Sequence, residues 1–413
     1  MLNPYRVLDL TDEKGFLCGK ILAELGAGVI KIEKPGGDVG RNIGPFFHDI
    51  PHPDKSLFWF AHNTDKRGIT LNIETTDGQE IFKKLVKTAD VVVESFAPGY
   101  LDSISLGYQH CSEINPGLIM TSITPYGQDG PYKDFKAYDL QIQAMGGTLY
   151  ICGFPGEPPI SWGGQQAYAQ GGLQAAAGTM MALYHREMAG EGQHVDVSMR
   201  EAMIVLTTTA SPVPNWIEAQ TIKQRRGSRL LNPSSAIVSR AFYQCNDGNV
   251  AYVLHMGVLG FSTNSLVDWM SEEGMAGNIR EEAKDFTKFG LTDVKQEQIS
   301  RWEQIIAKFF LTKTKNELLE GALKRRIMLY PVSNMADILA NPQLMSRDYF
   351  VELAHPELGS SITYPGAFFK ASETPCRLRH RAPLIGEHNK EIYIEELGFS
   401  EEQLVSLKES NII

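Results

Sequence analysis

The chain has 413 residues, of which 43% are hydrophobic and 21% are charged, so it is expected to be a soluble globular protein of two domains. Its formal net charge of -10 argues against nucleic acid and anionic membrane as partners. Scattered cysteines, a start without an apolar signal-peptide core, and no apolar run of about 18 residues predict a reduced, cytoplasmic protein.

The N-terminal part alternates between strand and helix patterns. Residues 6–10 are a short apolar run, and residues 16–25 place apolar side chains on one helical face before Gly26. Residues 29–33 return to strand character. This strand–helix–strand unit predicts a parallel sheet with a right-handed crossover.

Glycines follow the second of these strands at residues 36–40 (GGDVG). A dinucleotide-binding fingerprint needs G-x-G-x-x-G on the first strand-to-helix turn. The glycines here therefore predict a loop, and we expect no NAD site.

The next elements extend the sheet. Residues 77–87 predict an amphipathic helix, and residues 90–94 and 118–123 predict buried strands. Because ligands of open α/β sheets bind outside the carboxyl ends of strands, the segment after residue 94 is a candidate binding loop. Residues 136–147 are expected to be helical.

A stretch without Asp, Glu or Lys runs from Pro158 to Arg186. Its glycines and alanines, from Gly171 to Gly178, are typical of a helix that packs very closely against another backbone. Tyr168 lies just ahead of that helix. Residues 190–205 then predict a turn, a strand and a helix.

The remaining chain predicts a second, smaller domain. Prolines and basic residues break the pattern over 212–230, which we interpret as a linker. Strand-like runs near 242–255 and two helices over 296–325 predict a small α+β domain at 231–327. Residues 328–413 are expected to return to the large domain begun by residues 1–211. The ten histidines show no metal-ligand spacing, so no metal site is expected.

Segments spread over nearly the whole chain resemble the class III CoA-transferases. In the family's order they are VLDLT with LAELGAGVIKIEKPGGD, NTDKRGITLNI, ADVVVESFAPGYLD, NPGLIMTSITPYGQDGPY, AYD, GEGQHVDVSMREA and RAPLIGEH. The resemblance implies an α/β fold with a Rossmann-like large domain built from both chain ends and a small α+β domain between them. It also implies a dimer of interlocked rings.

The resemblance further implies transfer of CoA from an acyl-CoA to a carboxylic acid. In the family's transferases an Asp carboxylate attacks the thioester to give a mixed anhydride. CoA thiolate converts this anhydride to an enzyme-linked thioester, from which the incoming carboxylate takes the CoA. Such steps need an ionised carboxylate as nucleophile and leaving group, and N–H donors for the oxyanion. Coenzyme A and its acyl esters are thus the expected ligands.

The family's nucleophile is missing here. Aligned without gaps from Pro158 to Gly172, its position is Tyr168, and a shift of one residue either way gives an alanine. A phenol, with a reference pKa of about 10, cannot form an anhydride. We expect Tyr168 to fill the space of the lost acid, and Asp139 of the AYD motif is the surrogate candidate. The loop at 161–166 is expected to shape the acyl pocket.

The family's CoA contacts are kept only in part. Lys34 stands where the family often has an Arg for the nucleotide phosphates, although each lysine could equally be a solvated surface charge. Asp12 replaces a residue that is commonly His or Gln, and its charge would repel phosphates. The cofactor-binding residues implied by the resemblance are Lys34, Leu71, Asn72, Ser95, Phe96 and Lys136.

Three functional hypotheses follow. In the first, the chain is the subunit without a nucleophile in a heteromer, as in the two-subunit benzylsuccinate CoA-transferase of anaerobic toluene degradation, and a homologous subunit carries the catalytic Asp. CoA would then move between an acyl-CoA, such as succinyl-CoA, and an acid such as benzylsuccinate. In the second, a homodimer performs non-covalent acyl-CoA transfer, isomerisation or lyase chemistry with Tyr168 as acid. The third is a CoA-ester binding protein without turnover. The sequence favours the first.

Overall fold

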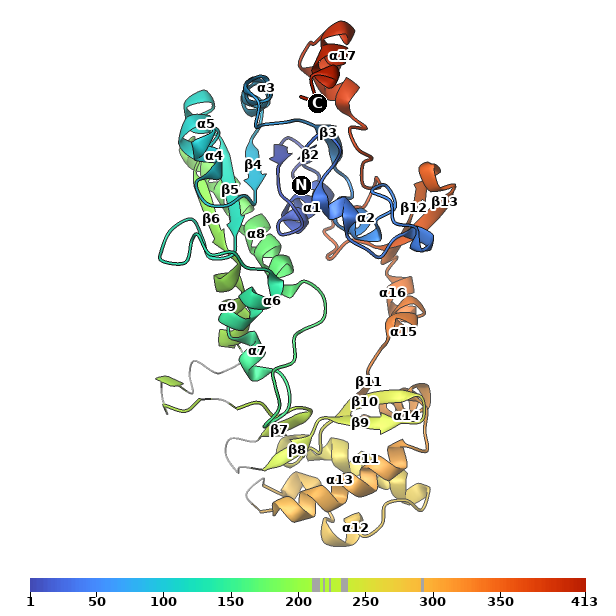
Figure 1. Cartoon of the computed structure of the whole chain (residues 1–413). Helices are drawn as coiled ribbons and strands as arrows, with labels where there is room; N and C mark the ends of the chain where they lie inside the picture. Colours follow the sequence, from blue (N-terminus) through green and yellow to red (C-terminus); the bar gives the residue numbers. More distant parts are fainter. Residues whose placement is uncertain (210–215, 218–219, 223, 232–236, 291–292) are drawn as a thin grey trace. The chain divides into compact units, whose positions relative to one another are not determined.

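The computed structural model describes residues 1–209, 216–217, 220–222, 224–231, 237–290 and 293–413 and divides the chain into two compact units (Figure 1). Unit 1 comprises Met1–Leu149, Ser161–Ile222 and Gln343–Ile413, so both ends of the chain contribute to it. Unit 2 comprises Tyr150–Ile160 and Lys223–Pro342.

These units and the predicted domains differ in three places. Residues 150–160 belong to unit 2, and unit 2 extends to Pro342, beyond the predicted end of the small domain at residue 327. The predicted linker at 212–230 is divided between the units, because unit 1 extends to Ile222 and unit 2 continues from Lys223. Some residues of the predicted linker and small domain lie outside the described residues; they are 212–215, 218–219, 223, 232–236 and 291–292.

Unit 1 is built on a parallel sheet with the strand order β3-β2-β1-β4-β5-β6, which confirms the predicted parallel α/β fold. In the register of the sheet, Val7 lies between Val29 and Val91. Runs of β-branched residues such as these are typical of strands buried on both faces. The order reverses at β1 and β4, so ligands are expected at the carboxyl ends of these two strands. The strands are β1 (Arg6–Asp9), β2 (Gly28–Glu33), β3 (Arg67–Thr70), β4 (Val91–Glu94), β5 (Ile119–Thr124) and β6 (His194–Ser198).

Helices cover both faces of this sheet because successive side chains of a strand point to opposite faces. Val7 and Val91 pack with α1 and α8, whereas Leu8 and Val92 pack with α3 and α5. The helices predicted over 16–25 and 77–87 are confirmed as α1 and α3. Outside unit 2, or at its boundaries, the helices are α1 (Phe16–Glu24), α2 (Leu57–His62), α3 (Thr76–Val86), α4 (Tyr100–Ser103), α5 (Tyr108–Ile114), α6 (Asp139–Met145), α7 (Thr148–Ile151), α8 (Gln166–Ala189), α9 (Met199–Thr209), α16 (Pro342–Ser346) and α17 (Glu401–Glu409).

Helix α8 approaches its neighbours closely because small residues line its inner face. A Cβ on Gly172 would lie 3.0 Å from the Cβ of Leu17 in α1, and one on Gly171 would lie 2.7 Å from the Cγ of Met199. The close packing predicted from the small residues is confirmed, and it fixes the start of α8 against α1. Within the part of the chain that the structure describes, no helix has the length and apolar character that crossing a membrane requires.

The C-terminal segment packs on the N-terminal half of unit 1. Tyr364, in an antiparallel hairpin, packs with Phe16 and Trp59. The hydroxyl of Tyr393 donates a hydrogen bond to the carbonyl oxygen of Thr70, at the end of β3 (2.6 Å). These contacts join the two chain ends in one unit. Before α17, the elements are β12 (Phe350–His355), β13 (Ser360–Pro365) and a π-helical stretch (Glu391–Glu396).

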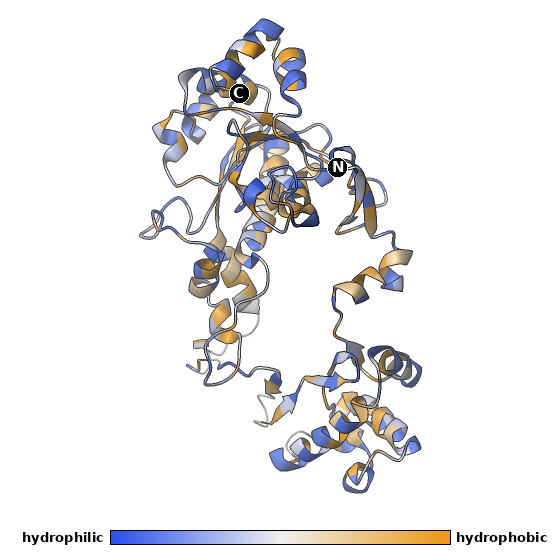
Figure 2. Cartoon of the chain, turned by 45° about the vertical axis from the view of Figure 1, so that its right-hand side comes forward, coloured by the Kyte–Doolittle hydropathy of each residue, from blue (hydrophilic) through white to orange (hydrophobic). Residues whose placement is uncertain are grey.

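Unit 2 has its own hydrophobic core between a small antiparallel sheet and its helices (Figure 2). Trp302, Phe309 and Phe310 of α13 are fully buried, and the ring of Trp302 meets that of Phe286 edge-on at 5.3 Å. The helices predicted over 296–325 are confirmed as α13 and α14. The elements are β7 (Arg229–Leu231), β8 (Val238–Arg240), β9 (Phe242–Cys245), β10 (Gly248–Tyr252), β11 (Leu329–Pro331), α11 (Gly260–Glu272), α12 (Ile279–Glu282), α13 (Gln296–Phe310), α14 (Lys315–Arg325) and α15 (Met335–Leu339).

Buried ion pairs hold the loops at the carboxyl edge of the parallel sheet. The ammonium group of Lys66 donates to the Asp9 carboxylate (2.7 Å) and to the carbonyl oxygen of Phe16 (3.0 Å). The guanidinium of Arg41 makes two hydrogen bonds to Glu33 (2.6 and 2.7 Å). Since all four charges are buried, the loss of one member of a pair would leave the other with weaker compensation, from Lys31 for Asp9 and from Asp54 for Arg41.

Glu94, the last residue of β4, is a buried carboxyl of a different kind. Its side chain accepts a hydrogen bond from the backbone N–H of Phe96 (2.7 Å). Burial raises the pKa of the Glu94 carboxyl to about 7, and hydrogen bonds from Ser122 and Phe96 oppose this rise. The folded protein therefore holds a proton that the unfolded chain loses near pH 4.

We expect Lys66→Met to lower the free energy of unfolding by about 3–5 kcal/mol, because Asp9 would stay buried without the cation that bonds to it directly. The matched control is Lys83→Met, which removes the partner of the exposed Glu80 and should cost less than about 1 kcal/mol. Urea unfolding measures both losses. Similar small losses of unfolding free energy in the two variants would show that the Asp9–Lys66 pair does not stabilise the folded protein.

Glu94→Gln is expected to flatten the dependence of stability on pH. In the wild type, the free energy of unfolding falls as pH rises from about 4 through 7, because the unfolded chain releases the Glu94 proton first. Between about pH 5 and 8 this contribution is about 2–3 kcal/mol. Urea unfolding at both pH values measures this contribution, and Glu80→Gln, at an exposed site, is the control. An equal change in the free energy of unfolding with pH in Glu94→Gln and in the wild type would contradict the prediction.

Candidate functional site

Tyr168 and Asp139 meet at the start of helix α8. Tyr168 lies in the first turn of α8, so the prediction that it lies just ahead of the helix is wrong, because the helix begins at Gln166. Its side chain is only 5% exposed. Its hydroxyl accepts a hydrogen bond from the backbone N–H of Asp139 (3.2 Å). The Asp139 carboxylate accepts hydrogen bonds from the backbone N–H groups of Ala167 (2.7 Å) and Tyr168 (3.3 Å). Asp139, the first residue of α6, thus caps the N-terminus of α8, where a negative charge is favourable.

Tyr168 is a neutral phenol in this environment. Burial, and then the nearby Glu13 carboxylate, raise the pKa of Tyr168 well above its usual range. The side chain therefore stays protonated at neutral pH and can donate a hydrogen bond. The first turn of α8 (residues 166–169) offers no anionic nucleophile.

A cavity of about 380 Å³ lies beside Tyr168. Glu13, from the loop between β1 and α1, forms part of its wall. One carboxylate oxygen of Glu13 is shielded from solvent and has no hydrogen-bond partner among the described residues. Burial and the neighbouring Asp12 raise the pKa of the Glu13 carboxyl. The cavity is lined by Glu13, Ile43, Tyr138, Asp139, Leu140, Gln143, Ser161, Trp162, Gly164, Gln165 and Tyr168.

Sequence reasoning missed Glu13. A usable signal was its place four residues after the end of β1, at the point where the strand order reverses and ligands bind. Its position beside α8 depends on the close packing of α1 at Gly172, which the local sequence does not specify.

A second cavity, of about 150 Å³, lies at the carboxyl ends of the central strands and brings together three of the predicted cofactor-binding residues. Lys34, Leu71 and Phe96 line it, together with Asp12. The Lys34 ammonium lies 2.7 Å from Glu74, and both side chains are largely exposed. Because an exposed ion pair contributes little, Lys34 could exchange Glu74 for a phosphate group.

The other predicted residues lie away from the lining of that cavity. The hydroxyl of Ser95 donates to the carboxylate of Asp12 (2.7 Å) and accepts from its backbone N–H (2.9 Å). The side chain of Asn72 accepts a hydrogen bond from the backbone N–H of Glu74 (3.1 Å) and so shapes the turn after β3. Lys136 is exposed and lines neither cavity.

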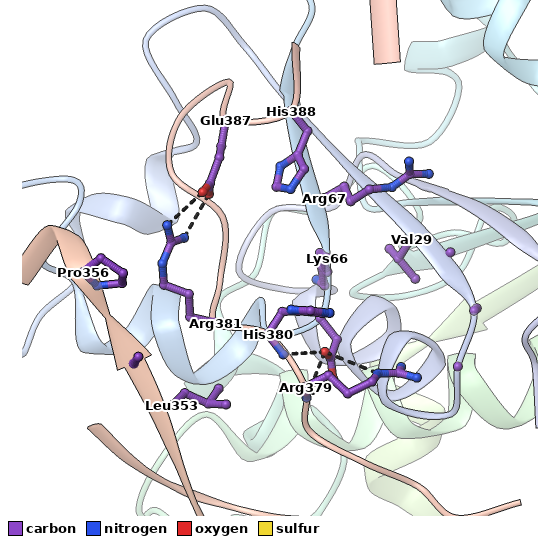
Figure 3. Close-up of a pocket in the computed structure, with 15 residues that line it drawn as sticks. Val29, Lys66, Arg67, Leu353, Pro356, Arg379, His380, Arg381, Glu387 and His388 are labelled. Carbon is purple, nitrogen blue, oxygen red and sulfur yellow. Dashed lines mark hydrogen bonds and ion pairs between the residues drawn. The ribbon is translucent and has the colours of Figure 1, made fainter. Parts of the chain in front are cut away.

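A larger cavity, of about 700 Å³, lies at the other edge of the sheet, where β2 and β3 begin (Figure 3). Its arginines pair with carboxylates. Arg381 pairs with Glu387 (2.8 Å), Arg67 with Glu391 (2.6 Å) and Arg379 with Asp65 (3.7 Å). No group of three or more His, Cys, Asp or Glu side chains able to share a metal ion occurs within the described ranges. The two cavities beside the β1–α1 loop are therefore the candidate functional site.

Comparison with known proteins agrees with this architecture. The model of the family described as CoA-transferase family III matches residues 2–389. The succinyl-CoA:(R)-benzylsuccinate CoA-transferase subunit BbsE of Thauera aromatica is 34% identical over 395 residues, which cover 95% of this chain and 93% of that one. The formyl-CoA:oxalate CoA-transferase of Streptomyces avermitilis is 33% identical over 427 residues, which cover 100% and 99%. The crystal structure of a CAIB/BAIF family protein from Brucella suis aligns with a TM-score of 0.81 at 26% identity, over 95% of this chain and 98% of that one. The chain belongs to CoA-transferase family III.

Proposed function

We propose that this chain is a subunit of a class III CoA-transferase whose nucleophilic carboxylate belongs to a homologous partner subunit. The observation that carries the proposal is the neutral Tyr168, with Asp139 capping the helix, at the start of α8. Covalent CoA transfer needs an ionised carboxylate that can become an anhydride and then a thioester. A chain that keeps the fold without that group can complete the enzyme while its partner does the covalent chemistry.

The substrates in this proposal are an acyl-CoA such as succinyl-CoA and a carboxylic acid such as benzylsuccinate. The name of the relative BbsE, at 34% identity, supports this choice. CoA would lie with its nucleotide end at Lys34, Leu71 and Phe96, which share a cavity at the sheet edge. Asn72 and Ser95 would hold the turns around that end, and Lys136 would reach the phosphates from its exposed loop.

The assembly in this proposal is a cytoplasmic, interlocked dimer of two related chains, each with a Rossmann-like large domain. Tyr168 would fill the place of the acid in this chain. Asp139 would maintain the N-terminus of α8, since its carboxylate is already committed to two backbone N–H groups.

Native mass spectrometry of the complex purified from its source tests the proposal. We expect this chain together with a homologous chain that has Asp at the position aligned with Tyr168. The pair should transfer CoA, and Asp→Asn in the partner should lower kcat by at least about three orders of magnitude. Robust transfer by this chain alone would remove the proposal.

A second candidate function is favoured by Glu13. Its shielded carboxyl has a raised pKa and lies close enough to Tyr168 to affect the pKa of that phenol. A carboxyl of this kind beside a neutral phenol could move a proton on a bound acyl-CoA. A homodimer would then catalyse non-covalent acyl-CoA transfer, isomerisation or lyase chemistry. A CoA-ester binding protein without turnover is the remaining alternative.

Substitutions in the Tyr168 cavity separate these candidates. If the partner supplies the nucleophile, Glu13→Gln and Tyr168→Phe in this chain should leave the kcat of the complex within about twofold, as should Gln165→Ala in the same cavity. A loss of about two orders of magnitude in Glu13→Gln, with Gln165→Ala unaffected, would contradict the partner-subunit proposal and favour acid–base chemistry in this chain.

A further inference from the structure

Unit 2 has a cavity of about 590 Å³ formed by residues of that unit alone. Its wall combines apolar side chains with three arginines that follow one another closely in the sequence. The lining residues are Phe154, Pro155, Arg225, Arg226, Ser228, Arg229, Val238 and Gln296.

Backbone contacts fix the turn that carries the arginines. Gly227 has a φ of +58°, a conformation that favours glycine, and its N–H donates to the carbonyl oxygen of Gly153 (2.9 Å). A Cβ at Gly227 would lie 2.2 Å from the ring of Phe154. The N–H of Arg229 donates to the carbonyl oxygen of Arg226 (3.2 Å). The turn therefore holds the arginines next to an aromatic wall.

The charges of these arginines are not neutralised by carboxylates. The guanidinium of Arg225 donates to the carbonyl oxygen of Glu157 (2.9 Å) and lies over the ring of Tyr150, and both groups are uncharged. No ion pair of 4.0 Å or less joins Arg225, Arg226 or Arg229 to a carboxylate in the described part of the chain.

Three other arginines of unit 2 pair with carboxylates: Arg280 with Asp268, Arg301 with Glu282 and Arg325 with Glu272. Arg240 and Arg326 lie over aromatic rings instead. Arg229 acts electrostatically on the carboxyl of Glu303. That carboxylate, however, accepts its hydrogen bond from the backbone N–H of Arg240 (2.6 Å). Three like charges without a paired carboxylate repel one another, and a bound anion would relieve that repulsion.

We propose that this cavity binds a small organic carboxylate that has an apolar body. Arg226 and Arg229 would hold the carboxylate, because a guanidinium matches its two oxygens. Phe154 and Val238 would contact the apolar part. The larger basic cavity of unit 1 does not compete as an anion site, because its arginines already pair with Glu387 and Asp65 (Figure 3). The inference goes beyond the proposed function, since binding here needs neither a partner subunit nor CoA.

Isothermal titration calorimetry of the full-length protein tests this site with benzylsuccinate, succinate and inorganic pyrophosphate. We expect benzylsuccinate to bind more tightly than succinate, because only the former reaches the apolar wall. Arg226→Gln should weaken benzylsuccinate binding about tenfold or more, and Arg226→Gln with Arg229→Gln should remove saturable binding. The matched control, Arg301→Gln, removes an arginine of the same unit that pairs with Glu282 and should leave the affinity unchanged.

Three results would overturn the inference. The first is a benzylsuccinate affinity that neither Arg226→Gln nor the double variant alters. The second is a wild-type protein that binds neither carboxylate saturably, and the third is tighter binding of pyrophosphate than of both carboxylates, which would assign the cavity to phosphate groups. None of these results bears on CoA transfer by the complex, so the proposed function is tested separately.

Discussion

The buried ion pair between Asp9 and Lys66 is the contact on which the candidate site depends. It ties the end of β1 to the start of β3 and so fixes the loop that enters α1. The fit is tight, because a Cβ on Gly19 of α1 would lie 2.1 Å from the Asp9 carboxylate. In the loop held this way, Asp12 lines the cavity at the sheet edge and Glu13 lines the cavity beside Tyr168. One short segment thus places a carboxylate in the wall of each cavity.

Electrostatics at the start of α8 explains how the helix N-terminus is stabilised with a neutral side chain at position 168. The N-terminus of a helix favours a negative charge, and Asp139 supplies it from a neighbouring helix. Glu13 and Asp139 then surround Tyr168 with carboxylates that favour its neutral form. The cap on α8 therefore needs no charge on residue 168.

The sequence allowed prediction of features that depend on local pattern. Apolar runs and helical periodicity identified the parallel sheet, and the glycines around Gly172 predicted that α8 packs closely against another backbone, which the structure identifies as α1. Features that depend on tertiary contacts could not be predicted from the sequence. The position of Glu13 beside Tyr168 requires β1, α1 and α8 to pack together, and the role of Asp139 as a cap requires α6 to meet α8. Arg225, Arg226 and Arg229 fall in the predicted linker, yet they line a cavity of unit 2.

The central claim is that the covalent chemistry belongs to the partner subunit. Intact-protein mass spectrometry of the complex, quenched during turnover with acyl-CoA and acceptor acid, tests it most directly. We predict a CoA-thioester adduct on the partner chain and an unmodified mass for this chain. A CoA adduct on this chain, at Glu13 or at Asp139, would contradict the claim.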